Sequence, residues 1–275
     1  MRKLAKNLLS NLLYLIPSGL RYEICRHHAN KEFAENRSDF RTNGELWLIK
    51  KIFPRVGVVF DVGSHTGDWA SHALRINPHI SLHCFEPNRK AFKIFMNNVQ
   101  GENVTVNCVG LGEKDGQQSF YVFDEIGEGS SLFRRKGLEN IVGPSSLRKI
   151  EKVDIRTLDS YCTDKNIEEI DFMKIDVEGN ELAVVKGGRN LFESDGVKIV
   201  QFEYGGTYID SRNLLKDFYD FFEGLNYSFF LLYPDQVRHI PRYDQRLENF
   251  QYKNFVLVNV HVMTQIRLFQ QSGAW

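Results

Sequence analysis

The chain has 275 residues, which is enough for one large α/β domain or two small ones. Lysine plus arginine and aspartate plus glutamate both number 35, so the formal net charge is zero and gives no bulk attraction for nucleic acid. The four cysteines form no C-x-x-C pair, so their spacing predicts no zinc site, and reduced thiols in the cytoplasm fit it best.

The first 50 residues contain no strand-like run and predict a helical extension. Leucines recur at helical spacing from Leu4 to Leu15, and basic residues stand at the start. Polar residues and Pro17 break the stretch before it reaches the about 20 apolar residues that a membrane span needs. We expect a helix packed on the body of the protein, with reversible contact to a membrane surface as the alternative.

Short apolar runs then alternate with helical segments. Residues 56–60, 80–85 and 104–111 predict strands, and residues 68–76 and 88–99 predict helices. Apolar, β-branched runs of this kind are typical of strands buried on both faces. The alternation therefore predicts a parallel sheet that is covered by helices on both sides.

The alternation pauses after residue 111. Residues 117–123 and 152–158 alternate in polarity and predict an antiparallel hairpin or an excursion from the sheet. Between them, residues 124–149 are rich in glycine, serine and charge, and include Ser130, Ser131, Arg134, Arg135 and Lys136. A loop of this length is either an acceptor-binding lid or a solvated linker.

The alternation resumes to the end of the domain. Strands are predicted at 171–175 and 198–202, and helices at 181–192 and 214–225. Two closing strands, 228–233 and 254–260, could pair antiparallel. We place one α/β domain at residues 51–262, after the extension of 1–50 and before a tail of 263–275.

The first strand leads into the loop Asp61-Val62-Gly63-Ser64-His65-Thr66-Gly67. Its G-x-x-x-G spacing departs from the dinucleotide fingerprint, because His65 stands where the second glycine would approach a pyrophosphate. A carboxylate at Asp61 favours a ligand with positive charge, and S-adenosylmethionine carries an ammonium and a sulfonium. The alternative is that Asp61 caps the next helix or binds loop amides.

The second strand ends in Glu86-Pro87-Asn88. An acid about 20 residues beyond the glycine loop, at the tip of the second strand, suits the two hydroxyls of a ribose. Pro87 then begins the next helix well, since the N–H that it lacks is not needed there. The alternative is an acid that only favours the helix start.

Four motifs together resemble the FkbM family of methyltransferases. They are Asp61-Val62-Gly63-x-x-x-Gly67, Phe85-Glu86-Pro87, Thr157-Leu158-Asp159 and Lys174-Ile175-Asp176-Val177-Glu178-Gly179-x-Glu181. The resemblance covers about residues 39–260 and leaves the helical extension outside. It implies a class I, Rossmann-like methyltransferase fold, with a doubly wound, mostly parallel seven-stranded sheet that includes one antiparallel strand.

The resemblance also implies S-adenosylmethionine as cofactor, with transfer usually to oxygen of a sugar or natural product. We expect a small-molecule or glycan acceptor and no nucleic-acid partner. The sequence predicts no particular oligomeric state. The predicted cofactor contacts are Asp61, Gly63, Ser64, His65, Gly67, Glu86, Pro87, Asn88, Gly110, Leu111 and Asp176. Ser64-His65 departs from the Ala-Asn that family members commonly carry, which puts the contact to the methionine part in question.

Transfer to an alcohol needs a group that accepts its proton, and a positioned base contributes about 10²–10⁴-fold. The candidates are Asp176, Glu178, Glu203 and His65, with Asp176 favoured. Lys174 alternates with Asp176 along one strand and could hold or neutralise one of the acids. No ligand spacing demands a metal, so none is predicted, although a metal between Asp176 and Glu203 is a minor alternative.

Two further expectations concern the acceptor and the class of protein. Tyr204 and Tyr208 could stack on a sugar or another ring. The alternatives to a methyltransferase are a nicotinamide-dependent oxidoreductase, disfavoured by Asp61 and the missing glycine, and a non-catalytic nucleotide-binding scaffold.

Overall fold

The computed structural model describes residues 11–124, 129–137 and 147–270. The helices are α2 (Ser18–Glu32), α3 (Glu45–Ile52), α4 (Asp68–Ile76), α5 (Arg89–Asn98), α7 (Leu158–Lys165), α8 (Glu181–Lys186), α9 (Arg189–Glu193), α10 (Thr207–Ser211), α11 (Leu215–Phe222), α12 (Val260–Met263) and α13 (Arg267–Gln270), with 3₁₀ turns η1 (Phe53–Arg55) and η3 (Gln245–Leu247). The strands are β1 (Val58–Val62), β2 (Ser81–Phe85), β3 (Val104–Asn107), β4 (Gly110–Leu111), β5 (Gly116–Val122), β6 (Lys149–Arg156), β7 (Phe172–Ile175), β8 (Ile199–Tyr204), β9 (Tyr227–Leu232), β10 (Val237–Ile240) and β11 (Lys253–Asn259).

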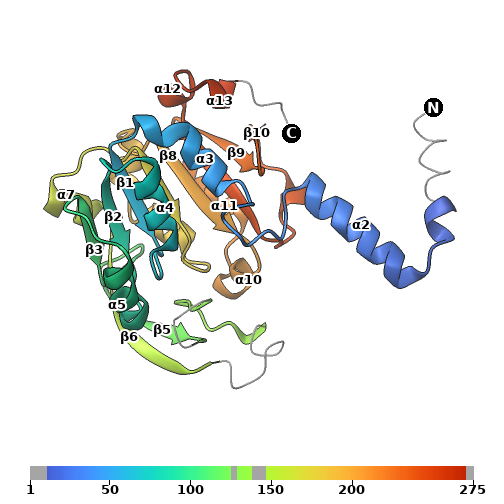
Figure 1. Cartoon of the computed structure of the whole chain (residues 1–275), viewed down its shortest axis with the longest axis horizontal. Helices are drawn as coiled ribbons and strands as arrows, with labels where there is room; N and C mark the ends of the chain where they lie inside the picture. Colours follow the sequence, from blue (N-terminus) through green and yellow to red (C-terminus); the bar gives the residue numbers. More distant parts are fainter. Residues whose placement is uncertain (1–10, 125–128, 138–146, 271–275) are drawn as a thin grey trace.

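A large sheet with the strand order β10-β9-β11-β8-β7-β1-β2-β3 forms the centre of the protein (Figure 1). Strands β1, β2, β3, β7 and β8 pair in parallel, and β11 is antiparallel to both β8 and β9. This confirms the predicted doubly wound α/β class with an antiparallel strand. The sheet has one strand more than expected, because the short β10 adds to the edge and pairs antiparallel with β9.

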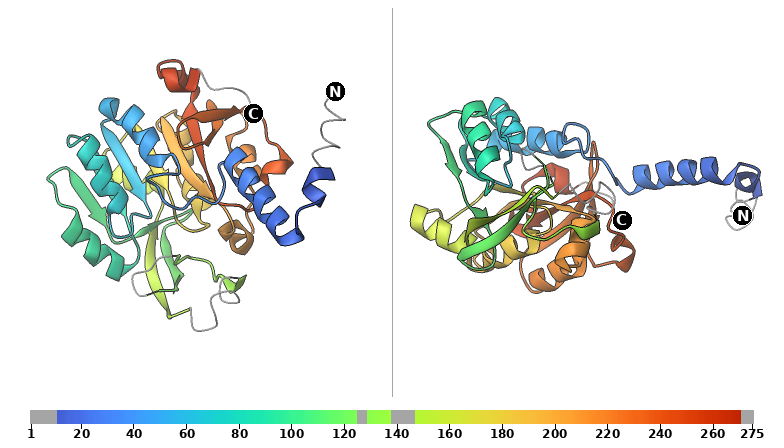
Figure 2. Two further views of the ribbon diagram at one scale, coloured as in Figure 1. Left: turned by 45° about the vertical axis from the view of Figure 1, so that its right-hand side comes forward. Right: turned by 90° about the horizontal axis from the view of Figure 1, so that it is seen from below.

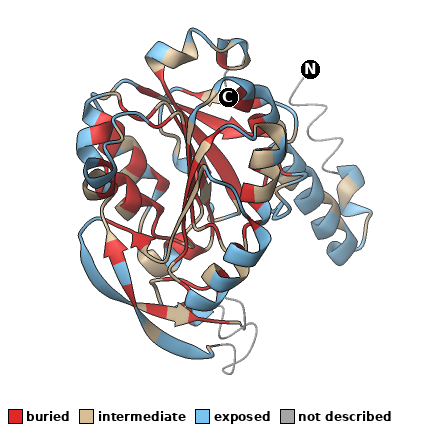
Figure 3. Cartoon of the chain, turned by 60° about the vertical axis from the view of Figure 1, so that its left-hand side comes forward, coloured by how far each residue is buried: buried red, intermediate tan, exposed pale blue. Residues whose placement is uncertain are grey.

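Both faces of the sheet are buried under helices, as the apolar strands require. One face packs against α3, α4, α5 and α13 through a core that includes Leu48, Trp69, Phe95 and Phe269. The other face packs against α7, α8, α9 and α11 through a second core. Figure 3 shows the strands between the two layers as the most buried part of the chain.

A second sheet of three strands, in the order β4-β6-β5, extends from one end of the large sheet (Figure 1). β5 and β6 pair antiparallel, which confirms the predicted hairpin. The strand expected over 104–111 is in fact two strands, since β3 belongs to the large sheet and β4 pairs with β6. The described part of the predicted lid, residues 129–137, lies between β5 and β6 and returns to β5 through an antiparallel bridge from Ser131 to Tyr121.

Helix α2 extends away from the body of the protein (Figures 1 and 2). It contains no buried residue, and Leu12 and Leu15 before it are 59% and 82% exposed. The expected packing of this segment on the body is therefore wrong for the residues that the structure describes, while residues 1–10 lie outside them. No helix in the described ranges is long and apolar enough to cross a membrane.

The extension ends earlier than residue 50. Ala34 is buried, α3 is part of the core, and a buried ion pair joins Lys253 Nζ to Glu35 Oε1 at 2.7 Å. We therefore place the start of the domain before Ala34. At the other end, Phe269 of the expected tail is buried against Phe230 of β9.

Candidate active site

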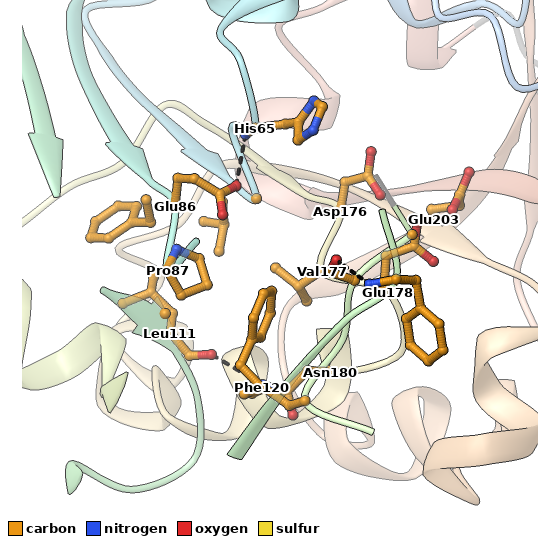
Figure 4. A pocket seen from close by; sticks show the side chains of 18 of the residues that line it. His65, Glu86, Pro87, Leu111, Phe120, Asp176, Val177, Glu178, Asn180 and Glu203 are labelled. Carbon is orange, nitrogen blue, oxygen red and sulfur yellow. Dashed lines mark hydrogen bonds between the residues drawn. The ribbon is translucent and has the colours of Figure 1, made fainter. Parts of the chain in front are cut away.

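A cavity of about 760 Å³ opens at the carboxyl ends of the parallel strands. Its walls come from the segments after β1, β2, β7 and β8, from β4 and β5, and from residues 129–135. Open α/β sheets bind ligands at this end, and the volume is that of an ordinary ligand pocket. Figure 4 shows Glu86 on one side of the cavity and Asp176, Glu178 and Glu203 gathered on the other.

The loop after β1 follows a backbone path that requires glycine. Gly63 has φ +87° and lines the cavity, and a Cβ placed there would lie 1.8 Å from the carbonyl oxygen of Asp176. The backbone N–H groups of Gly63 and Ser64 both donate to the carbonyl of Phe85. The loop is thereby fixed to the ends of β2 and β7, as expected for a segment that brings backbone close to a ligand.

Glu86 is nearly buried and lines the cavity just beyond β2. Its Oε2 accepts from the backbone N–H of His65 at 2.9 Å (Figure 4). Its Oε1 accepts from the backbone N–H of Asn88 at 2.7 Å. Burial raises the pKa of Glu86 to about 7, although both backbone hydrogen bonds oppose the shift. Each oxygen retains a further lone pair, so the carboxylate can accept two hydroxyls of a ligand.

An apolar wall lies beside Glu86. Phe85, Pro87, Leu111 and Phe120 line the cavity there, and the carbonyl of Leu111 accepts a hydrogen bond from Asn180 Nδ2 at 3.1 Å. Such a wall suits the flat face of an aromatic ring. Gly110 also lines it, which agrees with the prediction for Gly110 and Leu111.

Asp176 lines the cavity at the tip of β7 and is held by Lys174. Lys174 Nζ lies 2.8 Å from Asp176 Oδ2, as the alternation along the strand predicts. Burial alone would lower the pKa of Lys174, but the carboxylates of Asp176, Glu45 and Asp61 outweigh it and hold the pKa above its ordinary value. The ammonium of Lys174 thereby holds one of the two carboxylate oxygens of Asp176.

Glu181 shapes the turn that presents Asp176 and Glu178. Its Oε1 accepts from the backbone N–H groups of Val177 and Gly179, both at 3.1 Å, and burial raises its pKa to about 8. Glu178 has φ +55°, a backbone conformation that residues other than glycine rarely adopt. Of the three acids in the D-V-E-G-x-E motif, Asp176 and Glu178 line the cavity, whereas Glu181 supports the turn that forms its wall.

Glu203 lines the cavity from β8, next to the acids of β7. Burial raises the pKa of Glu203 well above its ordinary value, and the nearby charges of Asp176 and Glu178 raise it further. Both effects favour the protonated form of Glu203. The four predicted catalytic residues, His65 included, all line the same cavity.

Asp176, Glu178 and Glu203 form what we call the acid side of the cavity. Arg135, from the segment between β5 and β6, binds to this side. Its Nη1 donates to Glu178 Oε2 at 3.0 Å and to the carbonyl of Gly129 at 3.2 Å, and its Nη2 donates to Tyr252 Oη at 3.1 Å. Ser131 Oγ also donates to the carbonyl of Glu178 at 2.7 Å. The described residues 129–137 thus form part of the cavity wall, as the lid interpretation expects.

The structure places Asp61 behind the cavity wall. Asp61 is fully buried and is not among the described residues that line the cavity, whereas its neighbour Val62 is. Asp61 lies in register with Lys174, and neither of its carboxylate oxygens has a hydrogen-bond partner among the described residues. Burial raises its pKa to about 7, with Lys174 opposing the shift.

Three other predicted cofactor contacts serve the scaffold instead of lining the cavity. Ser64 is buried, and Gly67 begins α4 where a Cβ would lie 2.5 Å from Val99 Cγ2. Asn88 caps α5 by accepting from the backbone N–H groups of Lys90 and Ala91. These residues shape the binding loops from behind.

The proposed stacking role of Tyr204 and Tyr208 is also wrong. Both rings are buried and pack against each other 4.8 Å apart, away from the cavity. The aromatic groups that do line it are His65, Phe85, Phe120, Phe123 and Tyr252. No local pattern singles out Phe120 or Tyr252, which come from the excursion and from the segment before β11.

No group of metal-ligating side chains is found among the described residues. Lys174 and Arg135 instead supply positive charge at Asp176 and Glu178. Among the described residues, Lys174 and Arg135 are therefore the cations that neutralise acids of the cavity.

Comparisons with known proteins give matches to methyltransferases. A family model described as "Methyltransferase FkbM domain" matches residues 61–229, which include the described lining residues of the cavity apart from Ser38 and Tyr252. Methyltransferase 1 of Beauveria bassiana is 24% identical over 179 residues, covering 60% of this chain and 72% of that protein. The 2-O-methyltransferase NoeI of Sinorhizobium fredii is 27% identical over 177 residues, covering 58% and 69%. The hexuronic acid methyltransferase AglP of Haloferax volcanii is 27% identical over 164 residues, covering 58% and 62%.

Proposed function

The chain belongs to the FkbM methyltransferase family, and from that premise we propose that it transfers a methyl group from S-adenosylmethionine to a hydroxyl of a sugar or glycan. One observation carries the proposal. A single cavity combines a ribose-type acid, Glu86, beside an apolar wall with a separate group of acids at Asp176, Glu178 and Glu203.

The chain's residues fit S-adenosylmethionine. Glu86 would hold the ribose hydroxyls, the wall at Pro87 and Leu111 would hold the adenine, and the backbone at Gly63 leaves room for close approach. The bound donor supplies an electrophilic methyl group on a cationic sulfur. Asp61 lies behind the loop, in register with Lys174 of β7.

Asp176 is the base that we propose for the transfer. The acceptor hydroxyl would lose its proton to the carboxylate oxygen of Asp176 that Lys174 does not hold, while the bound donor would supply the methyl group. Lys174 holds the other oxygen of Asp176 and fixes its orientation. Glu203, which readily carries a proton, donates to a second acceptor oxygen and positions it.

A sugar acceptor is supported by two relatives that are named for such chemistry. NoeI is a 2-O-methyltransferase and AglP a hexuronic acid methyltransferase, each 27% identical to this chain. The acids and hydroxyl groups of the cavity provide many hydrogen-bond acceptors and donors, which suits a ligand rich in hydroxyls.

The test has two steps. Calorimetry should show binding of S-adenosylmethionine and none of NAD; the reverse result would favour an oxidoreductase. Incubation with a donor labelled in its methyl group and fractions of a cell extract should then label a product whose mass spectrum shows a methyl ether. An N-methylated product, or labelled protein, would overturn the choice of acceptor.

We also propose that the N-terminal segment makes reversible contact with an anionic membrane surface. Residues 1–31 hold six lysines and arginines against one acid, Glu23, in a chain of zero net charge, and Leu12 and Leu15 are exposed. The chain should float with phosphatidylcholine vesicles that contain phosphatidylglycerol, and Leu12→Ser/Leu15→Ser should abolish flotation. Equal flotation with phosphatidylcholine alone, or a dimer that depends on these leucines, would refute the proposal.

A further inference from the structure

The acid side of the cavity has a charge arrangement that bears on the acceptor. Asp176, Glu178 and Glu203 line it, and Arg135 is the only lysine or arginine among the described lining residues. Lys174, which does not line the cavity, is bound to Asp176 from behind. An incoming acceptor therefore meets three acids and a single cation on the cavity side.

That cation is committed to the protein. Arg135 donates to Glu178 at 3.0 Å, to Tyr252 at 3.1 Å and to the carbonyl of Gly129 at 3.2 Å, and only 10% of its side chain is exposed. A guanidinium bound to a carboxylate in a largely buried place is a strong pairing. An anionic acceptor would have to displace Glu178 to reach it.

The backbone around the pair resists such a displacement. Ser131 Oγ donates to the carbonyl of Glu178 at 2.7 Å and accepts from the backbone N–H of Phe133 at 3.0 Å. Glu178 itself holds a left-handed backbone conformation that Glu181 supports through Gly179. Both partners of the ion pair are thus fixed from two separate segments of the chain.

We propose that the Arg135–Glu178 pair makes this site select acceptors without negative charge, such as neutral sugars, and reject sugar acids. This inference rests on the proposed function. A carboxylate on the acceptor would lie among acids, and the one lysine or arginine among the described lining residues is already paired with Glu178. An unpaired charge in a poorly solvated place is strongly unfavourable. A hydroxyl in the same position can donate to the acids. Selection therefore comes from repulsion as well as attraction.

The pair also predicts how selection could be changed. In Glu178→Gln the side chain keeps its shape but loses its charge, so Arg135 becomes available to a carboxylate on the acceptor. Methylation of acidic acceptors should rise relative to neutral ones by roughly tenfold, as expected for one new charge-assisted contact. Adding Arg135→Met should remove the gain, because the receiving cation is then gone.

The experiment uses the full chain with a methyl-labelled donor and an extract separated by anion exchange into neutral and acidic saccharide pools. The wild-type chain should label the neutral pool. Glu178→Gln should shift label toward the acidic pool, and the double variant should lose that shift. Glu193→Gln, which removes an acid from the exposed pair with Arg189 outside the cavity, serves as the matched control.

The outcomes separate the two proposals. Preferential labelling of the acidic pool by the wild-type chain, or an unchanged ratio in Glu178→Gln that still binds donor, would overturn the selection while leaving the methyltransferase proposal intact. If Glu178→Gln does not fold, Arg135→Met takes its place, and increased labelling of the acidic pool by that variant would overturn the selection. Label in neither pool, with donor binding preserved, would overturn the proposed acceptor class and this inference with it.

Discussion

Replacing Glu86 by glutamine tests the most specific assignment in the cavity. The carboxylate accepts from the backbone N–H groups of His65 and Asn88, one on each oxygen, and its remaining lone pairs are proposed to receive two ribose hydroxyls. Glutamine keeps the size of the side chain but removes the charge, and it replaces one acceptor by an NH₂ donor.

The expected loss follows from the number of bonds affected. A hydrogen bond to a charged group contributes about 1.5–3 kcal/mol, and a neutral one about 0.5–1.5 kcal/mol. Removing the charge from two bonds to the ligand should therefore cost about 2–3 kcal/mol, which is roughly a 30- to 150-fold increase in Kd. The increase is measured by calorimetry with S-adenosylmethionine.

The pKa of Glu86 adds a second signature. Burial raises it to about 7 in the ligand-free chain, so the carboxylate becomes protonated as the pH falls through that value. If the donor binds the ionised form, wild-type affinity should fall roughly tenfold for each pH unit below 7. Glu86→Gln should lose this part of the pH dependence.

Glu102→Gln is the control, because Glu102 is exposed before β3, at the opposite end of the sheet's strands. Circular dichroism establishes that each variant is folded. A Kd for Glu86→Gln within about twofold of the wild-type value would refute the ribose assignment. The corresponding loss of binding free energy would be well below the contribution of one charge-assisted hydrogen bond.

Three further predictions concern the glycine loop of the cavity and two charged residues behind the cavity wall. Gly63→Ala places a Cβ 1.8 Å from the carbonyl oxygen of Asp176, so thermal unfolding should show a loss of about 1–3 kcal/mol or more and calorimetry no donor binding; normal binding would contradict the backbone argument. Lys174→Met leaves Asp176 Oδ2 without the ammonium that holds it, so kcat should fall while the donor Kd measured by calorimetry stays nearly constant; an unchanged kcat would contradict the positioning role. Asp61 has a folded pKa of about 7, above its ordinary value, so the folded chain holds the proton more tightly and stability should fall as pH rises from about 4 to 7. Denaturant unfolding across that pH range should show a smaller decline for Asp61→Asn, and an equal decline in both chains would contradict the buried position.

The alternation of apolar strands and helices was sufficient to predict the parallel sheet, because strands buried on both faces leave a clear pattern. When both faces of a strand are buried, however, the sequence does not indicate toward which face a residue at the strand end points. Phe60, Asp61 and Val62 are all buried, and only the structure shows that Val62 lines the cavity while Asp61 does not. Sequence reasoning could therefore find the loop but could not orient its acid.

Contacts between distant segments were the other limit. Arg135 was within the predicted lid, but its partner Tyr252 is 117 residues away in the chain, and no periodic pattern links the two. The edge strand β10 was missed for a related reason, since four residues that include Arg238 and His239 show too little alternation to predict a strand.

The junction between the projecting helix and the domain has a practical consequence for anyone who shortens the chain. Ser38 borders the cavity, Asn36 N–H donates to the carbonyl of Tyr252 at 2.7 Å, and Glu35 neutralises the buried ammonium of Lys253. A truncated protein that starts at residue 34 would keep these three contacts. One that starts at residue 51 would leave the buried ammonium of Lys253 without Glu35, and the loss of Ser38 would open one side of the binding site to water.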